Sequence, residues 1–381
     1  MIPAFLFISI ILTIAYCLLI GVYAYWFLQL KQYQLDASIT PQTTFSIIIP
    51  ARNEEAMIGK CLAGIQEQNY PTHLFEVIVV DDHSTDHTAE IITQLQVQFP
   101  GLKLIHLANH INTTINAYKK KAIEIAVAQT TGNWIVTTDA DCEVPPNWLL
   151  MMDNYIQKKQ PVFVAAPVMF TLHKSWLGLF QVLDFISLQG ITAAAVAAGY
   201  HSMCNGANLA YNKAAFYAVG QFKGIDHIAS GDDMLLMYKM KQQYKDQLGF
   251  LFSNQAIVKT APMDSWANFL QQRIRWASKA DRYEEKSIFW VLALVYFFNA
   301  FLLIGLILGF FVEELGTNIR LLLLAKTIVE CFFMIPVARF FEMQKTLLYF
   351  PLMQPFHILY TVIAGWLGKF GTYQWKGRTV N

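Results

Sequence analysis

Three acidic clusters and one cationic run hold the residues of this chain whose types and spacing could do chemistry. They occur in the order Asp81-Asp82, Asp139-Ala140-Asp141, Asp232-Asp233 and Gln272-Arg273-Ile274-Arg275-Trp276. Carboxylates can read a nucleotide base, hold a divalent cation or accept a proton, and arginine can neutralise a departing diphosphate. Together these groups suit a displacement reaction on a nucleotide diphosphate donor.

Asp139 and Asp141 are predicted to hold a divalent cation. They stand at the end of the apolar stretch 134–138, which is predicted to be a strand. Positions two apart on an extended backbone project to the same side, so both carboxylates can face one ion. Mg²⁺ usually takes one or two carboxylates together with substrate phosphates. An isolated Asp-x-Asp is also common in turns, and the place of this one after a strand favours the metal site.

Each of the two other acidic pairs precedes a predicted helix and therefore has two interpretations. One carboxylate of Asp81-Asp82 can accept a hydrogen bond from a base N–H, or both can cap the following helix. In Asp232-Asp233, two like charges side by side favour proton uptake by one of them, which suits a general base. Helix capping is the alternative there too.

Gln272, Arg275 and Trp276 stand at positions i, i+3 and i+4, so on a helix they share one face. Arginine can bind the leaving diphosphate, glutamine can bind phosphate or acceptor, and the indole can stack on an acceptor. An amphipathic surface helix is the alternative. Three other features stay open: 205–211 and 220–222 are either pocket wall or plain loop, and Lys119-Lys120-Lys121 either touch phosphate or are solvated.

Short apolar runs alternate with amphipathic stretches from Phe45 onward. Strands are predicted at 46–50, 75–80, 103–107 and 134–138, with helices at 54–68, 89–98 and 119–129 between them. This order predicts an α/β fold with a mostly parallel sheet covered on both faces. Ligands of such sheets bind beyond the carboxyl ends of the strands, where the acidic clusters stand.

The composition indicates a soluble domain with membrane segments attached. Of 381 residues, 55% are hydrophobic and 14% are charged, and the net charge of +1 gives no electrostatic footprint for nucleic acid. The five cysteines have no paired spacing, which argues against a disulfide framework and a zinc site and favours a reducing, cytoplasmic setting.

The first 31 residues are predicted to form a membrane anchor. The run 2–30 is uncharged and long enough to cross a bilayer as a helix. A cleaved signal peptide is the alternative, but there is no basic region before the apolar run. Positive charge begins at Lys31, so the domain that follows is expected to face the cytoplasm.

Three more apolar runs, at 288–312, 319–341 and 347–367, are predicted as membrane helices within 288–368. If all three cross, the basic tail 369–381 lies outside, against the positive-inside bias, so one of them is expected to be re-entrant or interfacial. The stretch 175–200 suits either an interfacial helix that brings a lipid acceptor to the site or an ordinary core helix.

Residues 45–282 resemble the catalytic domain of glycosyltransferase family 2, the large inverting family with the GT-A fold. The resemblance rests on motifs in order: Ile49-Pro50-Ala51-Arg52-Asn53-Glu54-Glu55, Val80-Asp81-Asp82-His83-Ser84-Thr85-Asp86, Asp139-Ala140-Asp141, Asp233 and Gln272-Arg273-Ile274-Arg275-Trp276. Trp375-Lys376-Gly377-Arg378 also looks like a tail of membrane-bound members. Two departures are Asp232 where the family commonly has Glu, and the lack of a glycine before Lys119.

The resemblance implies roles for individual residues. Asp233 would be the base, Gln272, Arg275 and Trp276 would close the site, and Asp139 and Asp141 would hold the nucleotide and a metal, Mg²⁺ or Mn²⁺. The residues implied to line the nucleotide are Pro50, Arg52, Glu54 and Asp82.

We therefore expect a GT-A domain with N- and C-terminal transmembrane helices, in a multi-pass protein of the inner (plasma) membrane with its catalytic domain in the cytoplasm. The expected activity is inverting transfer of a sugar from a nucleotide diphosphate sugar to a lipid or membrane-associated acceptor. A processive polysaccharide synthase is the nearest alternative, and an inactive membrane scaffold or a transporter is the alternative of another class. The sequence does not specify the donor sugar, its base or the acceptor.

Overall fold

The computed structural model describes residues 2–111, 115–280, 284–371, 373–375 and 378–380. Arg282, Lys376 and Gly377, which the sequence analysis used, lie outside these residues. The chain divides into two compact units. We call 31–171 with 202–261 the sheet unit, and 1–30 with 172–201 and 262–381 the helical unit.

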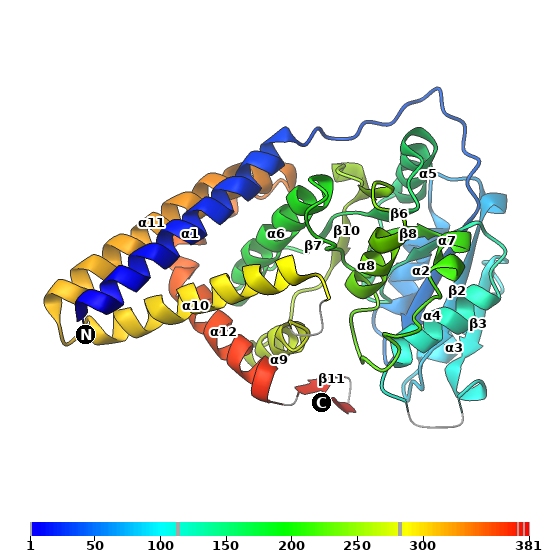
Figure 1. Ribbon diagram of the computed structural model, residues 1–381. Helices are drawn as coiled ribbons and strands as arrows, with labels where there is room; N and C mark the ends of the chain where they lie inside the picture. The colour runs from blue at the N-terminus through cyan, green and yellow to red at the C-terminus, as the bar shows by residue number, and fades with distance from the viewer. Residues whose placement is uncertain (1, 112–114, 281–283, 372, 376–377, 381) are drawn as a thin grey trace. The chain divides into compact units, whose positions relative to one another are not determined.

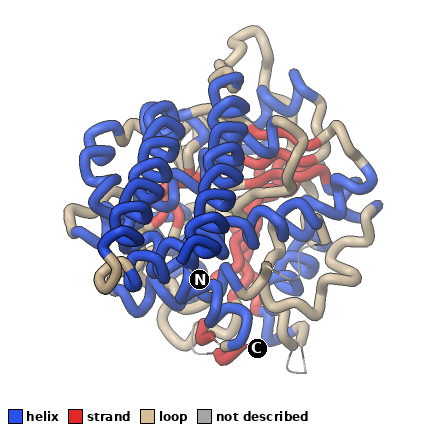
Figure 2. The backbone as a smooth tube through the Cα atoms, turned by 60° about the vertical axis from the view of Figure 1, so that its left-hand side comes forward, coloured by secondary structure: helices blue, strands red, loops and turns tan. Residues whose placement is uncertain are grey.

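The sheet unit is built on a seven-stranded sheet with the order β3-β2-β1-β4-β8-β6-β9. Strands β3, β2, β1 and β4 are parallel neighbours, and β8 is antiparallel to both β4 and β6. Figure 2 shows these strands side by side. The seven strands are β1 (Phe45–Ala51), β2 (Phe75–Asp81), β3 (Leu102–His106), β4 (Trp134–Thr137), β6 (Phe163–Ala165), β8 (Leu209–Asn212) and β9 (Leu248–Phe250). The prediction of a mostly parallel α/β sheet is confirmed.

Helices connect these strands, and three further strands form a second, smaller sheet. The helices are α2 (Ile58–Gln66), α3 (Thr88–Leu95), α4 (Tyr118–Ala128), α5 (Trp148–Lys159), α7 (Lys213–Ala218) and α8 (Met234–Gln243), with short 3-10 turns η1 (Thr72–Leu74), η2 (Leu107–Asn109) and η3 (Asn254–Ala256). The smaller sheet has the order β5-β10-β7, with β5 (Cys142–Glu143), β7 (Val168–Phe170) and β10 (Val258–Thr260).

The first helix of the sheet unit begins later than the sequence predicts. Apolar periodicity suggested a start at residue 54, whereas α2 begins at Ile58. Asn53 has a left-handed backbone with φ 52°, and its N–H donates to Ser84 Oγ at 3.0 Å. Contacts across the two loops therefore delay the helix, and residues 52–57 remain a loop at the end of β1.

The helical unit contains helices that are long and apolar enough to cross a membrane. Five described segments meet this criterion. They are α1 (Ile2–Gln29), α6 (Trp176–Ala197), α10 (Lys286–Leu308), α11 (Glu313–Phe340) and the pair η4 (Gln344–Tyr349) with α12 (Phe350–Phe370). The unit also contains α9 (Trp266–Ala277), β11 (Tyr373–Trp375) and β12 (Arg378–Val380). Figure 1 shows α1 and α11 running side by side.

Helix α6 differs from the other apolar helices in burial. Its most apolar window is 78% buried, whereas the corresponding windows of α1 and α10 are each 22% buried. Gly190 lies so close to α11 that an added Cβ would stand 2.6 Å from Val337. This burial favours the core-helix interpretation of 175–200, and the interfacial role stays a prediction.

Helices α10 and α11 form a tight antiparallel hairpin. A Cβ on Gly309 would lie 2.5 Å from the Gly316 Cα, and one on Gly305 would lie 2.6 Å from Ile319. Larger side chains would hold the two helices apart at their turn. Contacts of other helices with α10 and α11 can therefore be compared by their distance from the turn of this hairpin.

Helix α12 runs across this hairpin. Gln354 Oε1 accepts a hydrogen bond from Lys326 on α11, and a Cβ on Gly365 would touch Tyr296 on α10. Lys326 lies roughly seven residues along α11 from the Gly305–Ile319 contact, and Tyr296 lies roughly nine residues along α10 from it, so both are at a similar distance from the turn of the hairpin. Their partners on α12, in contrast, are about 16 Å apart along the axis of α12. Figure 1 shows α12 crossing the direction of α10.

A buried polar cluster joins α1, α11 and α12. Lys326 Nζ lies 2.7 Å from Glu330 Oε1 and 2.6 Å from Gln354 Oε1, and Gln354 Nε2 donates to Glu330 Oε2 at 2.6 Å. The Tyr16 hydroxyl donates to Glu330. Lys326 and Glu330 stand four residues apart on α11 and pair on one helix face, which satisfies both charges inside the helical unit.

Candidate active site

The acidic clusters of the sheet unit follow strands that are neighbours in the sheet. Asp81 ends β2, Pro50 pairs with Val80 near the end of β1, and Asp139 follows β4 on the other side of β1. These strands are parallel, so their carboxyl ends meet at one edge. The long apolar runs bury the strands and leave the polar residues where the strands stop.

The loops after β1 and β2 hold each other by hydrogen bonds. Arg52 Nη1 donates to the carbonyl oxygens of Asp82 at 2.8 Å and His83 at 3.2 Å. The Asp82 N–H donates to the Ala51 carbonyl at 2.8 Å, and the Glu54 N–H donates to Thr88 Oγ1 at 2.8 Å. Arg52, Glu54 and Asp82 are therefore brought together, with Asp82 buried and its Oδ1 lying 2.9 Å from His83 Nδ1.

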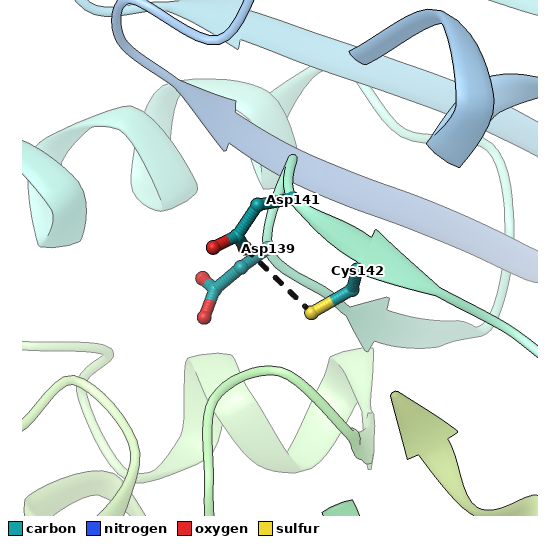
Figure 3. A group of neighbouring side chains, drawn as sticks. All are labelled: Asp139, Asp141 and Cys142. Carbon is teal, nitrogen blue, oxygen red and sulfur yellow. Dashed lines mark hydrogen bonds between the residues drawn. The ribbon is translucent and has the colours of Figure 1, made fainter. Parts of the chain in front are cut away.

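The Asp139–Asp141 turn has the donor set of a hard metal site. Figure 3 shows the two carboxylates on the same side of the turn, with Cys142 beside them. Ligand atoms of Asp139, Asp141 and Cys142 all lie within 4.8 Å of one another. Burial, and then the two aspartates, raise the pKa of the Cys142 thiol well above its usual range. The carboxylate oxygens fit Mg²⁺ or Mn²⁺.

Lys119 links the Asp139–Asp141 pair to the Asp232–Asp233 pair. Its ammonium lies 2.8 Å from Asp139 Oδ1 and 3.3 Å from Asp232 Oδ2. Burial lowers the pKa of Lys119, and the carboxylates of Asp139 and Asp232 outweigh this and raise it above the usual value. Lys119 is therefore a firmly charged residue of the site. Its position at the start of the helix that precedes β4 is the signal that the sequence offered.

Asp233 has one of the two properties that its position suggested, because it caps helix α8, and its role as a base stays a prediction. Its Oδ1 accepts from the Met234 N–H at 2.8 Å as the N-cap of α8, and its Oδ2 accepts from the Gly206 N–H at 3.1 Å. A Cβ at Gly206 would lie 3.2 Å from Lys119 Nζ and 3.3 Å from Asp232 Oδ2. Gly206 therefore lies beside the acidic pair, and the interpretation of 205–211 as a pocket wall stays a prediction.

Gln272, Arg275 and Trp276 lie on α9 of the helical unit. Arg273, which follows Gln272, is buried. The Arg273 side chain is 3% exposed and donates to Asp184 Oδ2 from Nε at 3.1 Å and from Nη2 at 2.6 Å. Arg273 Nη1 donates to Gln272 Oε1 at 2.8 Å, and its guanidinium lies 4.3 Å from the centre of the Trp276 ring. Arg273 therefore orients two of the predicted site residues, a role that helical spacing alone did not indicate.

Two family descriptions match the chain. "Glycosyl transferase family 2" matches residues 46–220, and "Glycosyl transferase family group 2" matches residues 134–366. The second match covers more than half of the chain. The chain therefore belongs to glycosyl transferase family 2, and the resemblance noted from its motifs is confirmed.

Curated relatives match this chain over part of their length. The beta-monoglucosyldiacylglycerol synthase of Synechocystis is 35% identical over 133 residues, which are 35% of this chain and 26% of that protein. The probable glycosyltransferase YdaM of Bacillus subtilis is 26% identical over 237 residues, 61% of this chain and 54% of that protein. The chain thus spans between about a quarter and a half of these relatives.

Among solved structures, a mannosyltransferase from Pyrobaculum calidifontis, PcManGT, in complex with GDP-Man and Mn²⁺, is similar over almost the whole chain. The TM-score is 0.59 at 17% identity, with 94% of this chain and 99% of that chain covered. At this identity the likeness concerns the fold, and it confirms the GT-A architecture.

Proposed function

We propose that this protein is a membrane-anchored inverting glycosyltransferase that moves a sugar from a nucleotide diphosphate sugar to a lipid or membrane-associated acceptor. The observation that carries the proposal is the pair of acidic clusters joined by Lys119, with Asp139 at 2.8 Å and Asp232 at 3.3 Å from one ammonium. This contact supports a single site in which one carboxylate pair would bind a cation and the neighbouring pair would supply the base.

The reaction would be a single displacement. Asp233 takes the proton of the acceptor hydroxyl while that oxygen forms a bond to the anomeric carbon and the bond to the nucleotide diphosphate breaks. A divalent cation held by Asp139 and Asp141 would supply positive charge to the diphosphate. Arg52 and Asp82 would hold the nucleotide, and Gln272, Arg275 and Trp276 keep the roles in leaving-group and acceptor binding that the sequence predicts.

The setting that we propose is the plasma membrane, with several crossings and the sheet unit in the cytoplasm. Five apolar helices of sufficient length support the membrane, and the charge step at Lys31 supports the orientation. The Synechocystis relative is named for a monoglucosyldiacylglycerol product, which supports a lipid acceptor. GDP-Man and Mn²⁺ in PcManGT support a nucleotide sugar with a divalent cation.

The proposal is tested with the purified full-length chain. Nucleotide sugars are first screened with Mn²⁺ by thermal shift, because a ligand that binds the folded state raises its apparent stability. The stabilising donor is then incubated with membrane lipid extract, and the products are weighed by mass spectrometry. One added sugar per lipid supports the proposal, a long polymer supports a polysaccharide synthase, and an absence of both transfer and donor hydrolysis refutes enzymatic function.

The role of the carboxylate pair has its own test. Calorimetry of nucleotide diphosphate binding should show a requirement for Mg²⁺ or Mn²⁺ in the wild-type protein, and Asp141→Ala should weaken that binding at least tenfold. Asp226→Ala, an exposed carboxylate of the same unit, is the control. Equal affinity with and without a chelator would remove the cation from the site.

A further inference from the structure

The three consecutive lysines of α4 have three different environments. Successive helical residues point about 100° apart, so adjacent side chains cannot share one role. Lys119 reaches Asp139 and Asp232 in the site, as described above. Lys121 is solvent-accessible and lies 3.3 Å from Glu124 one turn on. Lys120, between them, is buried with 2% exposure.

The Lys120 ammonium is enclosed by backbone carbonyl groups. It donates to the carbonyl oxygens of Ile225 at 2.8 Å, Ile228 at 2.7 Å and Ser230 at 2.9 Å. An ammonium has three N–H donors, and these contacts use each of them. All three carbonyls belong to the connection between α7 and α8, and we call the part that contains them the 222–231 loop.

The 222–231 loop has little regular structure of its own to fix its shape. Gly224 and Gly231 have left-handed backbones with φ 89° and φ 78°. Where the loop begins, Lys239 Nζ donates to the carbonyl of Lys223 at 2.8 Å and to that of Gln221, just before the loop, at 2.6 Å. Lysines from α4 and α8 therefore hold the loop by its carbonyl oxygens from two sides.

The 222–231 loop leads directly into the acidic pair. Ser230, whose carbonyl Lys120 binds, is followed by the left-handed Gly231 and then by Asp232 and Asp233. Asp233 is the N-cap of α8 and also binds the Gly206 N–H. A shift of the Ser230 carbonyl would move both carboxylates relative to Lys119 and Gly206.

We propose that Lys120 is a positioning residue for Asp232 and Asp233: by binding the carbonyls of Ile225, Ile228 and Ser230, it fixes the loop that carries the base. Helix α4 then sets the acidic site from two adjacent positions, through charge at Lys119 and through the loop backbone at Lys120. The catalytic part of this inference rests on the proposed function, and the structural part does not.

The test compares full-length Lys120→Met, which keeps the length of the side chain and removes its donors, with Lys121→Met as the matched control. A misplacement of about 1 Å can cost on the order of 100-fold in rate, so kcat should fall by about 10 to 100-fold in Lys120→Met. Nucleotide diphosphate affinity, measured with Mn²⁺ by calorimetry, should stay within about threefold because Lys119 and the loops after β1 and β2 are unchanged. Lys121→Met should keep both quantities.

Hydrogen exchange separates positioning from general stability. Lys120→Met should speed amide exchange in residues 225–233 and leave β1, β2 and β4 protected. Lys120→Gln, which keeps two donors on a shorter side chain, should show an intermediate kcat and serves if Lys120→Met does not fold. Unchanged kcat, or a loss of kcat and nucleotide affinity in parallel with faster exchange across the whole sheet unit, would overturn the proposal. If the wild-type protein lacks activity, the proposed function fails, and the exchange comparison still decides whether Lys120 holds the loop.

Discussion

At the scale of single residues, Asp233 is a structural N-cap whose contacts are compatible with the base role that we propose for it. It caps α8 through Oδ1 and binds the Gly206 N–H through Oδ2. Each carboxylate oxygen has a second lone pair, so proton acceptance is compatible with both contacts. The capping and base interpretations of this position are therefore not exclusive.

Asp233→Asn keeps the N-cap of α8, because asparagine caps as well as aspartate, and it removes the base together with the contact to the Gly206 N–H, which an amide NH2 cannot accept. We expect turnover to fall by about 100 to 10,000-fold, with nucleotide affinity within about threefold of wild type, measured by steady-state transfer and by calorimetry. Asp232→Asn is the comparison, because its carboxylate pairs with Lys119. If Asp232→Asn is the more damaging and Asp233→Asn keeps most of its turnover, then Asp232 is the base.

Glu76 is a buried carboxylate that ties β2 to its neighbours. It lies 2.7 Å from both Ser46 Oγ and Lys103 Nζ, and it accepts from the Thr131 N–H at 2.5 Å. Burial raises its pKa, and these hydrogen bonds, led by that of Lys103, outweigh burial and lower the pKa to about 2. The folded state therefore favours the charged carboxylate.

A pH dependence of stability follows. The contribution of Glu76 is fully present above its unfolded pKa of about 4.3 and is lost as pH falls towards the folded pKa of about 2. We expect Glu76→Gln to destabilise the protein by roughly 1 to 3 kcal/mol at pH 7 and by much less at pH 2.5. Denaturant unfolding at the two pH values measures this, with exposed Glu67→Gln as control. An equal loss at both would contradict the assigned cause.

At the scale of elements, α9 depends on a buried ion pair for its place in the helical unit. Asp184 of α6 receives two hydrogen bonds from Arg273 and one from the Tyr360 hydroxyl at 2.5 Å. The pair thus joins α6, α9 and α12. Because Arg273 also contacts Gln272 and Trp276, the same clamp orients the predicted site residues.

Removing one partner should be more harmful than removing both. Asp184→Ala leaves the Arg273 charge buried, which typically costs about 3 to 5 kcal/mol. The double variant Asp184→Leu with Arg273→Met should recover much of the unfolding temperature, because apolar groups replace both charges, but not the activity, because Gln272 and Trp276 lose their contact. Thermal unfolding in detergent and transfer assays measure both, with exposed Asp264→Ala as control. Full activity in the double variant would remove the orienting role from Arg273.

At the scale of the whole molecule, the direction of α12 bears on the number of membrane crossings. Its contacts with Lys326 and Tyr296 place it across the α10–α11 hairpin. If α1, α10 and α11 cross and α12 does not, the tail after Lys369 returns to the side on which α10 begins. The basic residues of the tail then agree with the positive-inside bias.

We therefore predict that the C-terminus is cytoplasmic. A green fluorescent protein fused after Asn381 should fluoresce, and alkaline phosphatase fused there should be inactive. Protease added to sealed right-side-out vesicles should leave the sheet unit intact. Active phosphatase at the C-terminus would make α12 a fourth crossing, and cleavage within the sheet unit would reverse the orientation of the protein.

Local patterns in the sequence determined the fold class and the candidate catalytic and metal-binding residues. Near-continuous apolar runs specify buried parallel strands, and long apolar runs specify helices of sufficient length to cross a membrane, because each depends on neighbours in the chain. The Asp139–Asp141 pair follows from the same logic, since alternation along an extended backbone puts both carboxylates on one side. The sequence also placed Asp233 before a helix, but it did not decide whether this residue caps the helix or acts as a base.

Contacts between distant segments decided the rest. Three features depend on residues that are far apart in the chain. They are the start of α2 at Ile58, the bridge from Lys119 to Asp139 and Asp232, and the burial of Arg273 against Asp184. Three adjacent lysines look alike in a sequence, yet one binds carboxylates, one binds carbonyls and one faces solvent. Helical geometry separates their directions, and only the packing around α4 decides what each of them meets.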